Sequence, residues 1–60
     1  MKFREIEKLI KNDGWEYLYT TGSHYYYIHP TKPGKVTIPY HNKDLKMKTV
    51  NSILKQAGLK

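Results

Sequence analysis

The sequence predicts a small α+β domain in which two amphipathic helices cover one face of a three-stranded antiparallel sheet. Apolar residues recur at helical spacing near both ends of the 60-residue chain. Between them lie three short segments rich in tyrosine, valine and isoleucine, which favour strands. Short connections between these segments favour an antiparallel meander. A chain of this length holds one core, so a single domain is expected over residues 1–60.

The first helix is predicted in the opening segment, where Phe3, Ile6, Leu9 and Ile10 share one face. It ends at residues 12–14, because Gly14 suits the left-handed position that follows a helix.

The first strand is predicted over residues 15–20, and strict alternation would place Trp15, Tyr17 and Tyr19 on one face. The third is predicted over residues 36–40, as an edge strand or one that stops at Pro39, which cannot donate to a ladder.

The second strand is predicted over residues 24–29, after a turn at residues 21–23. Alternation separates Tyr25 and Tyr27, expected beneath the helices, from three residues on the open face of the sheet: His24, Tyr26 and Ile28.

The second helix is predicted from the apolar residues Val50, Ile53, Leu54 and Ala57, with Met47 as a possible member. Gly58 is expected to follow its last turn, with Leu59 packing back on Leu54.

The net charge of +6 is confined to the second half of the chain. Residues 1–31 carry four basic and four acidic side chains, whereas residues 32–60 carry seven lysines and Asp44 alone. This asymmetry indicates a polyanionic partner, either a nucleic acid or an acidic protein surface. The alternative is a lysine face that only keeps the chain in solution.

Several classes of protein are not expected. The chain has no cysteine, which excludes disulfides and thiolate zinc sites, and no His-x-x-x-His pair supports another metal site. No apolar run of membrane-spanning length, no secretory signal and no glycine-rich phosphate loop is present. We therefore expect a cytoplasmic protein without a cofactor, a metal or a membrane contact.

His24 is the strongest candidate for chemistry. It follows Gly22 and Ser23, so a tight turn would place an imidazole at the start of a strand with one side open. The alternative is an ordinary polar surface residue. His29, before Pro30, is expected to be structural, whereas His41 lies near the lysine-rich loop and could assist at a phosphate.

Exposed aromatic and basic residues are the second candidate group. Tyr26 on the open face could stack on an unpaired base, although tyrosines also fill cores. Lys43, Lys46 and Lys48 are the best candidates for binding a phosphate backbone.

The chain resembles the HicA toxins of type II toxin–antitoxin systems over nearly its whole length. The resemblance rests on five motifs, in order: residues 12–15 (Asn-Asp-Gly-Trp), 22–24 (Gly-Ser-His), 29–30 (His-Pro), 38–41 (Ile-Pro-Tyr-His) and 52–59 (Ser-Ile-Leu-Lys-Gln-Ala-Gly-Leu). Two positions depart from many members: Lys48 stands in place of a glycine and Tyr19 in place of a basic residue.

The resemblance implies an α-β-β-β-α fold like that of double-stranded-RNA-binding domains and an mRNA interferase held inactive by a HicB-like antitoxin. It places the catalytic histidine at His24. The hypothesis is metal-independent cleavage of mRNA, with His24 as general base on the ribose 2′-OH and no action on DNA. The expected RNA contacts are Ser23, Tyr26, His41, Lys43, Lys46 and Lys48.

Two alternatives remain open from the residues. One is a noncatalytic small basic RNA-binding module of the same fold, in which His24 has no special role. The other is a partner domain whose lysines dock on an acidic protein.

Overall fold

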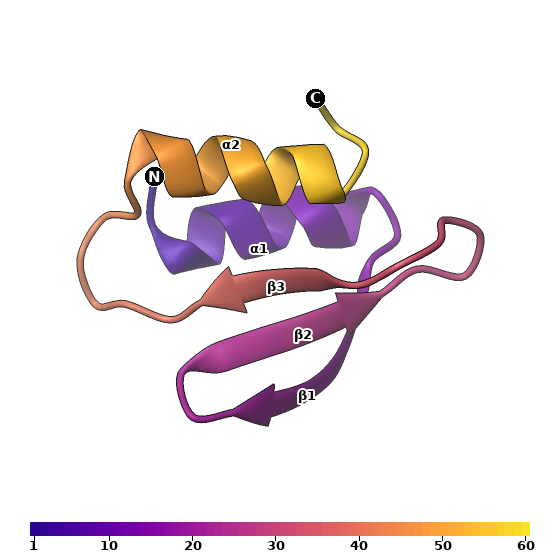
Figure 1. The fold of residues 1–60 in the computed structure, drawn as a ribbon, viewed down its shortest axis with the longest axis horizontal. Helices are drawn as coiled ribbons and strands as arrows, with labels where there is room; N and C mark the ends of the chain where they lie inside the picture. The colour runs from indigo at the N-terminus through magenta and orange to yellow at the C-terminus, as the bar shows by residue number, and fades with distance from the viewer.

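The computed structural model describes residues 1–60 and has the element order α1, β1, β2, β3, α2 (Figure 1). Their bounds are Phe3–Asn12 for α1, Glu16–Thr21 for β1, His24–Ile28 for β2, Val36–Pro39 for β3 and Met47–Gln56 for α2. The strands form one antiparallel sheet in the order β1-β2-β3, and both helices lie on the same side of it. The predicted fold class is confirmed, and strand bounds differ from the predicted ones by a single residue.

The core lies between the helices and the sheet and consists of apolar and aromatic side chains. Its buried members are Phe3, Ile6, Ile10, Trp15, Tyr27, Val36, Ile38, Leu45, Val50, Ile53 and Ala57. The Tyr27 hydroxyl reaches the rim of the core and donates a hydrogen bond of 2.5 Å to the Glu7 carboxylate. Burial, and then this carboxylate, raise the pKa of the Tyr27 phenol. As predicted, Tyr25 and Tyr27 face the helices while Ile28 remains exposed.

A bulge in β1 overturns one predicted side-chain assignment. Tyr17 pairs with Tyr27, but Tyr19 pairs with Tyr26, so β1 contains one extra residue between these two pairs. The extra residue reverses the alternation of side chains. Tyr17 therefore faces the helices with Tyr27, and Tyr19 stacks on Tyr26 on the open face, with ring centroids 4.7 Å apart. The prediction that Tyr17 and Tyr19 share a face is wrong.

Both helices end in the Schellman pattern that Gly14 and Gly58 predict. The two glycines have φ angles of +107° and +73°, which allow the chain to reverse. The backbone hydrogen bonds are Gly14 N to Lys11 O (3.0 Å), Trp15 N to Ile10 O (3.1 Å), Gly58 N to Lys55 O (3.1 Å) and Leu59 N to Leu54 O (2.8 Å).

Side chains join the two helix C-termini to each other. The Lys32 ammonium donates to the Asp13 carboxylate at 2.5 Å and to the Ala57 carbonyl at 3.1 Å. The Trp15 indole N–H donates to the same carbonyl at 3.3 Å. Lys32 is one of the seven lysines of the basic half, but its charge is used within the fold.

His29 completes this joint, which confirms its structural interpretation. Its Nδ1 accepts backbone N–H groups of Thr31 (3.0 Å) and Lys32 (3.1 Å), so the proton is assigned to Nε2, which donates to the Asp13 carbonyl at 2.7 Å. A Cβ at Gly14 would lie 2.7 Å from Nε2. Glycine is therefore required there for space as well as for its φ angle.

We predict that Asp13 stabilises the fold in a pH-dependent way. The hydrogen bond from Lys32 is the main cause that holds the pKa of the Asp13 carboxyl below its ordinary value of 3.8. A carboxyl with a lowered pKa stabilises the folded state above its ordinary pKa, and this contribution is lost as the pH falls through the lowered value. The melting temperature of Asp13→Asn should therefore lie below that of the wild type near neutral pH and approach it in strong acid. A difference between the two melting temperatures that stays constant down to pH ~2 would contradict this dependence of stability on the Asp13 carboxylate.

The direction of the elements decides which residues meet at each end of the molecule. Every element runs opposite to the one before it (Figure 1). The starts of α1, β2 and α2 therefore lie at the same end as the finishes of β1 and β3. We call this the basic end, and it is built from residues 1–4, 21–24 and 40–49. The joint made by Asp13, Trp15, His29, Lys32 and Ala57 lies at the opposite end.

Candidate functional site

A two-residue turn places His24 at the basic end. Gly22 has a φ angle of +58°, whereas Ser23, like every non-glycine residue, has a negative one. A glycine at the first of two central positions is typical of the type II′ hairpin turn. His24 follows as the first residue of the central strand, paired with Thr21 on one side and Pro39 on the other. Its side chain is exposed on a backbone held from both sides.

The 40–46 loop is fixed beside this turn by its two ends. At its start, the Tyr40 N–H donates to the Ser23 carbonyl at 2.6 Å, and the Tyr40 ring packs on Phe3 with centroids 5.0 Å apart. Near its finish, Leu45 is buried and its N–H donates to the Met1 carbonyl at 2.8 Å. The exposed residues between these anchors are therefore held close to the start of α1 and to the His24 turn.

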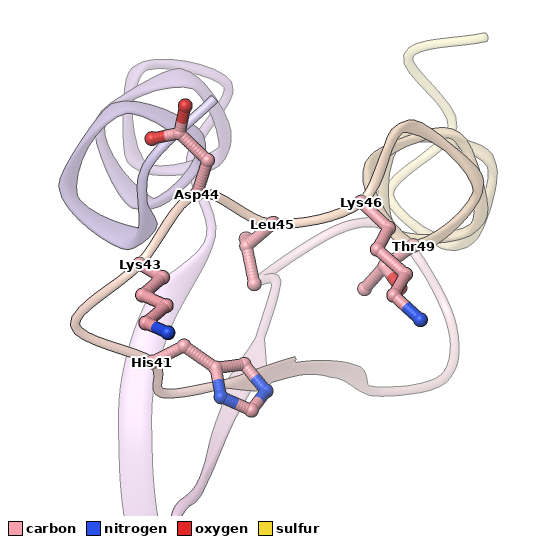
Figure 2. A pocket seen from close by; sticks show the side chains of 6 residues that line it. All are labelled: His41, Lys43, Asp44, Leu45, Lys46 and Thr49. Carbon is pink, nitrogen blue, oxygen red and sulfur yellow. The ribbon is translucent and has the colours of Figure 1, made fainter.

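A hollow of about 430 Å³, which we call the loop hollow, lies between this loop and the first turn of α2. It is lined by His41, Lys43, Asp44, Leu45, Lys46 and Thr49. In Figure 2, His41 and Lys43 lie on one side of it and Lys46 and Thr49 on the other, whereas the Asp44 carboxylate points away from the lysine side chains. The first turn of α2 contains no acidic residue. An anion in this hollow would meet positive charge from both sides.

The predicted site residues fall into two neighbouring groups. His41, Lys43 and Lys46 line the loop hollow together. Lys48 lines an adjoining hollow of about 300 Å³ between α2 and β3, which we call the helix–strand hollow. Ser23, His24 and Tyr26 line none of these hollows, because they belong to the turn and to the open face of β2. The two groups are adjacent, since Pro39, opposite His24, lies two residues before His41.

Sequence reasoning missed two cations of this site. Lys2 and Arg4 line a third hollow of about 210 Å³, the N-terminal hollow, together with Phe3, Tyr40, His41 and Asn42. Both belong to the half of the chain with no net charge, so the net charge of each half does not reveal them. The order of the elements could have revealed them. Because the chain reverses its direction at each connection, the first helix begins at the end of the molecule that holds the 40–46 loop.

Two properties of the whole chain complete the description. No three histidine, aspartate or glutamate side chains gather where they could hold a metal ion. Neither helix has the length and apolar character needed to cross a membrane.

A family model described as the HicA toxin of bacterial toxin–antitoxin systems matches residues 3–59. The chain belongs to the HicA toxin family. Its predicted family is thus confirmed over nearly the whole chain, and as a toxin of a toxin–antitoxin system it has an antitoxin as its partner. No curated protein matches the chain.

Proposed function

We propose that this toxin is a metal-independent endoribonuclease that stops translation in the cytoplasm by cleaving mRNA. The observation that carries the proposal is the position of His24. Its imidazole is exposed, its backbone is held between two strands, and the basic 40–46 loop is hydrogen-bonded to the same turn. A base with this access and rigidity suits proton removal from a bound ribose.

The proposed reaction is an internal transfer at phosphorus. His24 takes the proton of the ribose 2′-OH, and the 2′-oxygen forms a bond to the adjacent phosphorus. The bond from phosphorus to the 5′-oxygen breaks, and that oxygen takes a proton from water, a lysine or His41. Lys43, Lys46 and Lys48 bind the phosphate backbone and stabilise the charge that develops on the phosphate. Ser23 and Tyr26 flank His24 and contact the nucleotide on the open face.

The product ends and the choice of substrate test this function. Purified toxin should cleave RNA in the presence of EDTA and leave 2′,3′-cyclic phosphate and 5′-hydroxyl ends. DNA of the same sequence should remain intact because it lacks the attacking hydroxyl. Cleavage of DNA, or activity abolished by EDTA and restored by a divalent metal ion, would overturn the mechanism.

The antitoxin is proposed to be a HicB-like protein that covers His24 and the 40–46 loop with acidic or apolar groups. Complementary charge accelerates the encounter of two proteins, and salt screens it. We predict that the association rate of the complex falls as the salt concentration rises, measured by stopped-flow or surface binding. A rate independent of salt would contradict electrostatic docking.

A noncatalytic RNA-binding module is the second candidate. The stacked pair of Tyr19, which is exposed, and Tyr26, which is half-buried, favours it, because an exposed aromatic ring can stack on an unpaired base. RNA binding without any cleavage, equal in the wild type and in His24→Ala, would support this candidate over the nuclease.

The turn before His24 gives a further prediction. Gly22→Ala should destabilise the fold by about 1–2 kcal/mol, because an alanine is forced into a left-handed conformation, and it should also slow RNA cleavage by displacing His24. Gly34→Ala is the matched control, since Gly34 also has a positive φ angle and a Cβ at either glycine meets open space. Urea unfolding should show similar losses in both variants, with cleavage reduced only in Gly22→Ala. Equal cleavage by the two variants would contradict the positioning role of the turn.

A further inference from the structure

We propose that single-stranded RNA binds along a continuous track of three hollows around the basic end and that Arg4 and Lys48 bind phosphates at its two extremes. This proposal rests on the nuclease function proposed above, and it states where the substrate lies on either side of the cleaved bond.

The track is continuous because neighbouring hollows share residues. His41 lines both the N-terminal hollow and the loop hollow. Thr49 lines both the loop hollow and the helix–strand hollow. The three hollows therefore follow one another from the first residues of α1, past the 40–46 loop, to the face of α2 beside β3. His41, at the first junction, is two residues beyond the partner of His24, so a strand in the track passes beside the proposed base.

The cations along the track are available for a ligand. They are Lys2 and Arg4 in the first hollow, Lys43 and Lys46 in the second and Lys48 in the third. The ion pairs within the chain instead join Lys11 to Glu7 and Lys32 to Asp13. Asp44 is the one acidic residue that lines any of the three hollows. Unpaired cations along a groove are what a phosphate backbone requires.

The third hollow adds groups that can recognise ribose. It is lined by the hydroxyls of Thr37, Thr49 and Ser52 and by the amide of Gln56. The Gln56 Oε1 accepts the Thr37 backbone N–H at 3.3 Å, which fixes the amide and leaves its NH₂ group for a ligand. A 2′-OH both donates and accepts hydrogen bonds, as these side chains do. This part of the track therefore favours RNA over DNA and over an acidic peptide.

Chemical-shift mapping locates the bound strand. Isotope-labelled His24→Ala toxin, which should not cut, is titrated with a randomised eight-nucleotide single-stranded RNA. The expected shifts fall on the backbone signals of Arg4, His41, Thr49 and Ser52. Shifts confined to the open face, at Tyr19, Tyr26 and Ile28, would overturn the track and leave the nuclease function standing. Absence of RNA binding would overturn the track, and absence of cleavage by the wild type would separately overturn the function. Equal shifts with the matching DNA or with polyglutamate would show that the surface recognises charge alone, which contradicts the proposal.

Charge-neutral variants test the two extremes of the track. In the His24→Ala background, Arg4→Gln with Lys48→Gln should reduce the slope of log affinity against log salt by about 1.4, because each cation on a single strand contributes about 0.7. Lys8→Gln with Lys55→Gln is the control, since it removes the same charge from the same two helices at exposed positions outside the track. An equal fall in slope for both pairs would reduce the track to general attraction by net charge and overturn it.

Discussion

His24→Ala should cut RNA about 10²- to 10⁴-fold more slowly than the wild type, the range expected for loss of a positioned general base. The exposed imidazole lies outside the buried core, so the variant should fold normally. The proposed phosphate contacts remain in place, so affinity for RNA should change little. The measurement compares single-turnover cleavage with equilibrium binding of the same RNA.

The pH dependence of cleavage separates a base from a residue that only contacts the substrate. The limb of the rate profile that rises with pH should be present in the wild type and absent from the residual activity of His24→Ala. His41→Ala serves as the comparison, because His41 lines the track but does not belong to the turn that holds His24. We expect it to weaken RNA binding while it retains the limb assigned to His24. If His24→Ala retains the rate of the wild type, the residue has no catalytic role.

The fold could be predicted from the sequence because local signals agreed with one another. Gly14 and Gly58 marked helix ends that the structure confirms, and alternation in β2 correctly separated Tyr27 from Ile28. The bulge in β1 was not predictable, because the regular spacing of Trp15, Tyr17 and Tyr19 is that of an unbroken strand and does not reveal the extra residue between Tyr17 and Tyr19. The alternation of polar and apolar residues reveals a shift of one residue only where one face of the strand is polar.

The sequence predicted only in part which candidate residues lie together, for a reason of topology. His41, Lys43 and Lys46 are close in sequence and remain together in one hollow. Lys2 and Arg4 join them only because α1 begins where β3 finishes, and no local pattern contains that information. The excess of positive charge in residues 32–60 also overstates the free charge there, since Lys32 is paired with Asp13.

The molecule divides its tasks between its two ends. The basic end carries exposed cations, a turn and a loop, and its candidate residues make few contacts that the fold depends on. The opposite end carries the helix C-termini, joined by side chains of Asp13, Trp15, His29 and Lys32. Substitutions of the exposed candidate residues at the basic end should therefore change RNA binding or cleavage, and those in the joint at the opposite end should change stability.

Trp15→Ala should be the most damaging substitution at that opposite end. Trp15 is 2% exposed, follows the last turn of α1 and packs against the ring of His29 with centroids 5.2 Å apart. Removal of a buried tryptophan side chain costs about 3–5 kcal/mol. A 60-residue domain has a total stability of only about 3–9 kcal/mol at 0.05–0.15 kcal/mol per residue. We therefore expect the isolated variant to lose most or all of its folded population at 37 °C.

Trp15→Phe separates the packing of the ring from its hydrogen bond. The phenyl ring retains much of the apolar contact but cannot donate to the Ala57 carbonyl, which still accepts a hydrogen bond from Lys32. Because that carbonyl keeps a partner, the lost bond should cost only about 0.5–1.5 kcal/mol beyond the lost volume. Urea unfolding followed by far-ultraviolet circular dichroism should give the highest free energy of unfolding for the wild type, a lower one for Trp15→Phe and the lowest for Trp15→Ala. Fluorescence would not serve, because Trp15 is the only tryptophan.

A partner that binds only folded toxin shifts the folding equilibrium by mass action, so the antitoxin should restore the folded form of Trp15→Ala. Stability of Trp15→Ala within 1 kcal/mol of the wild type would show that the joint between the helix ends does not hold the fold together.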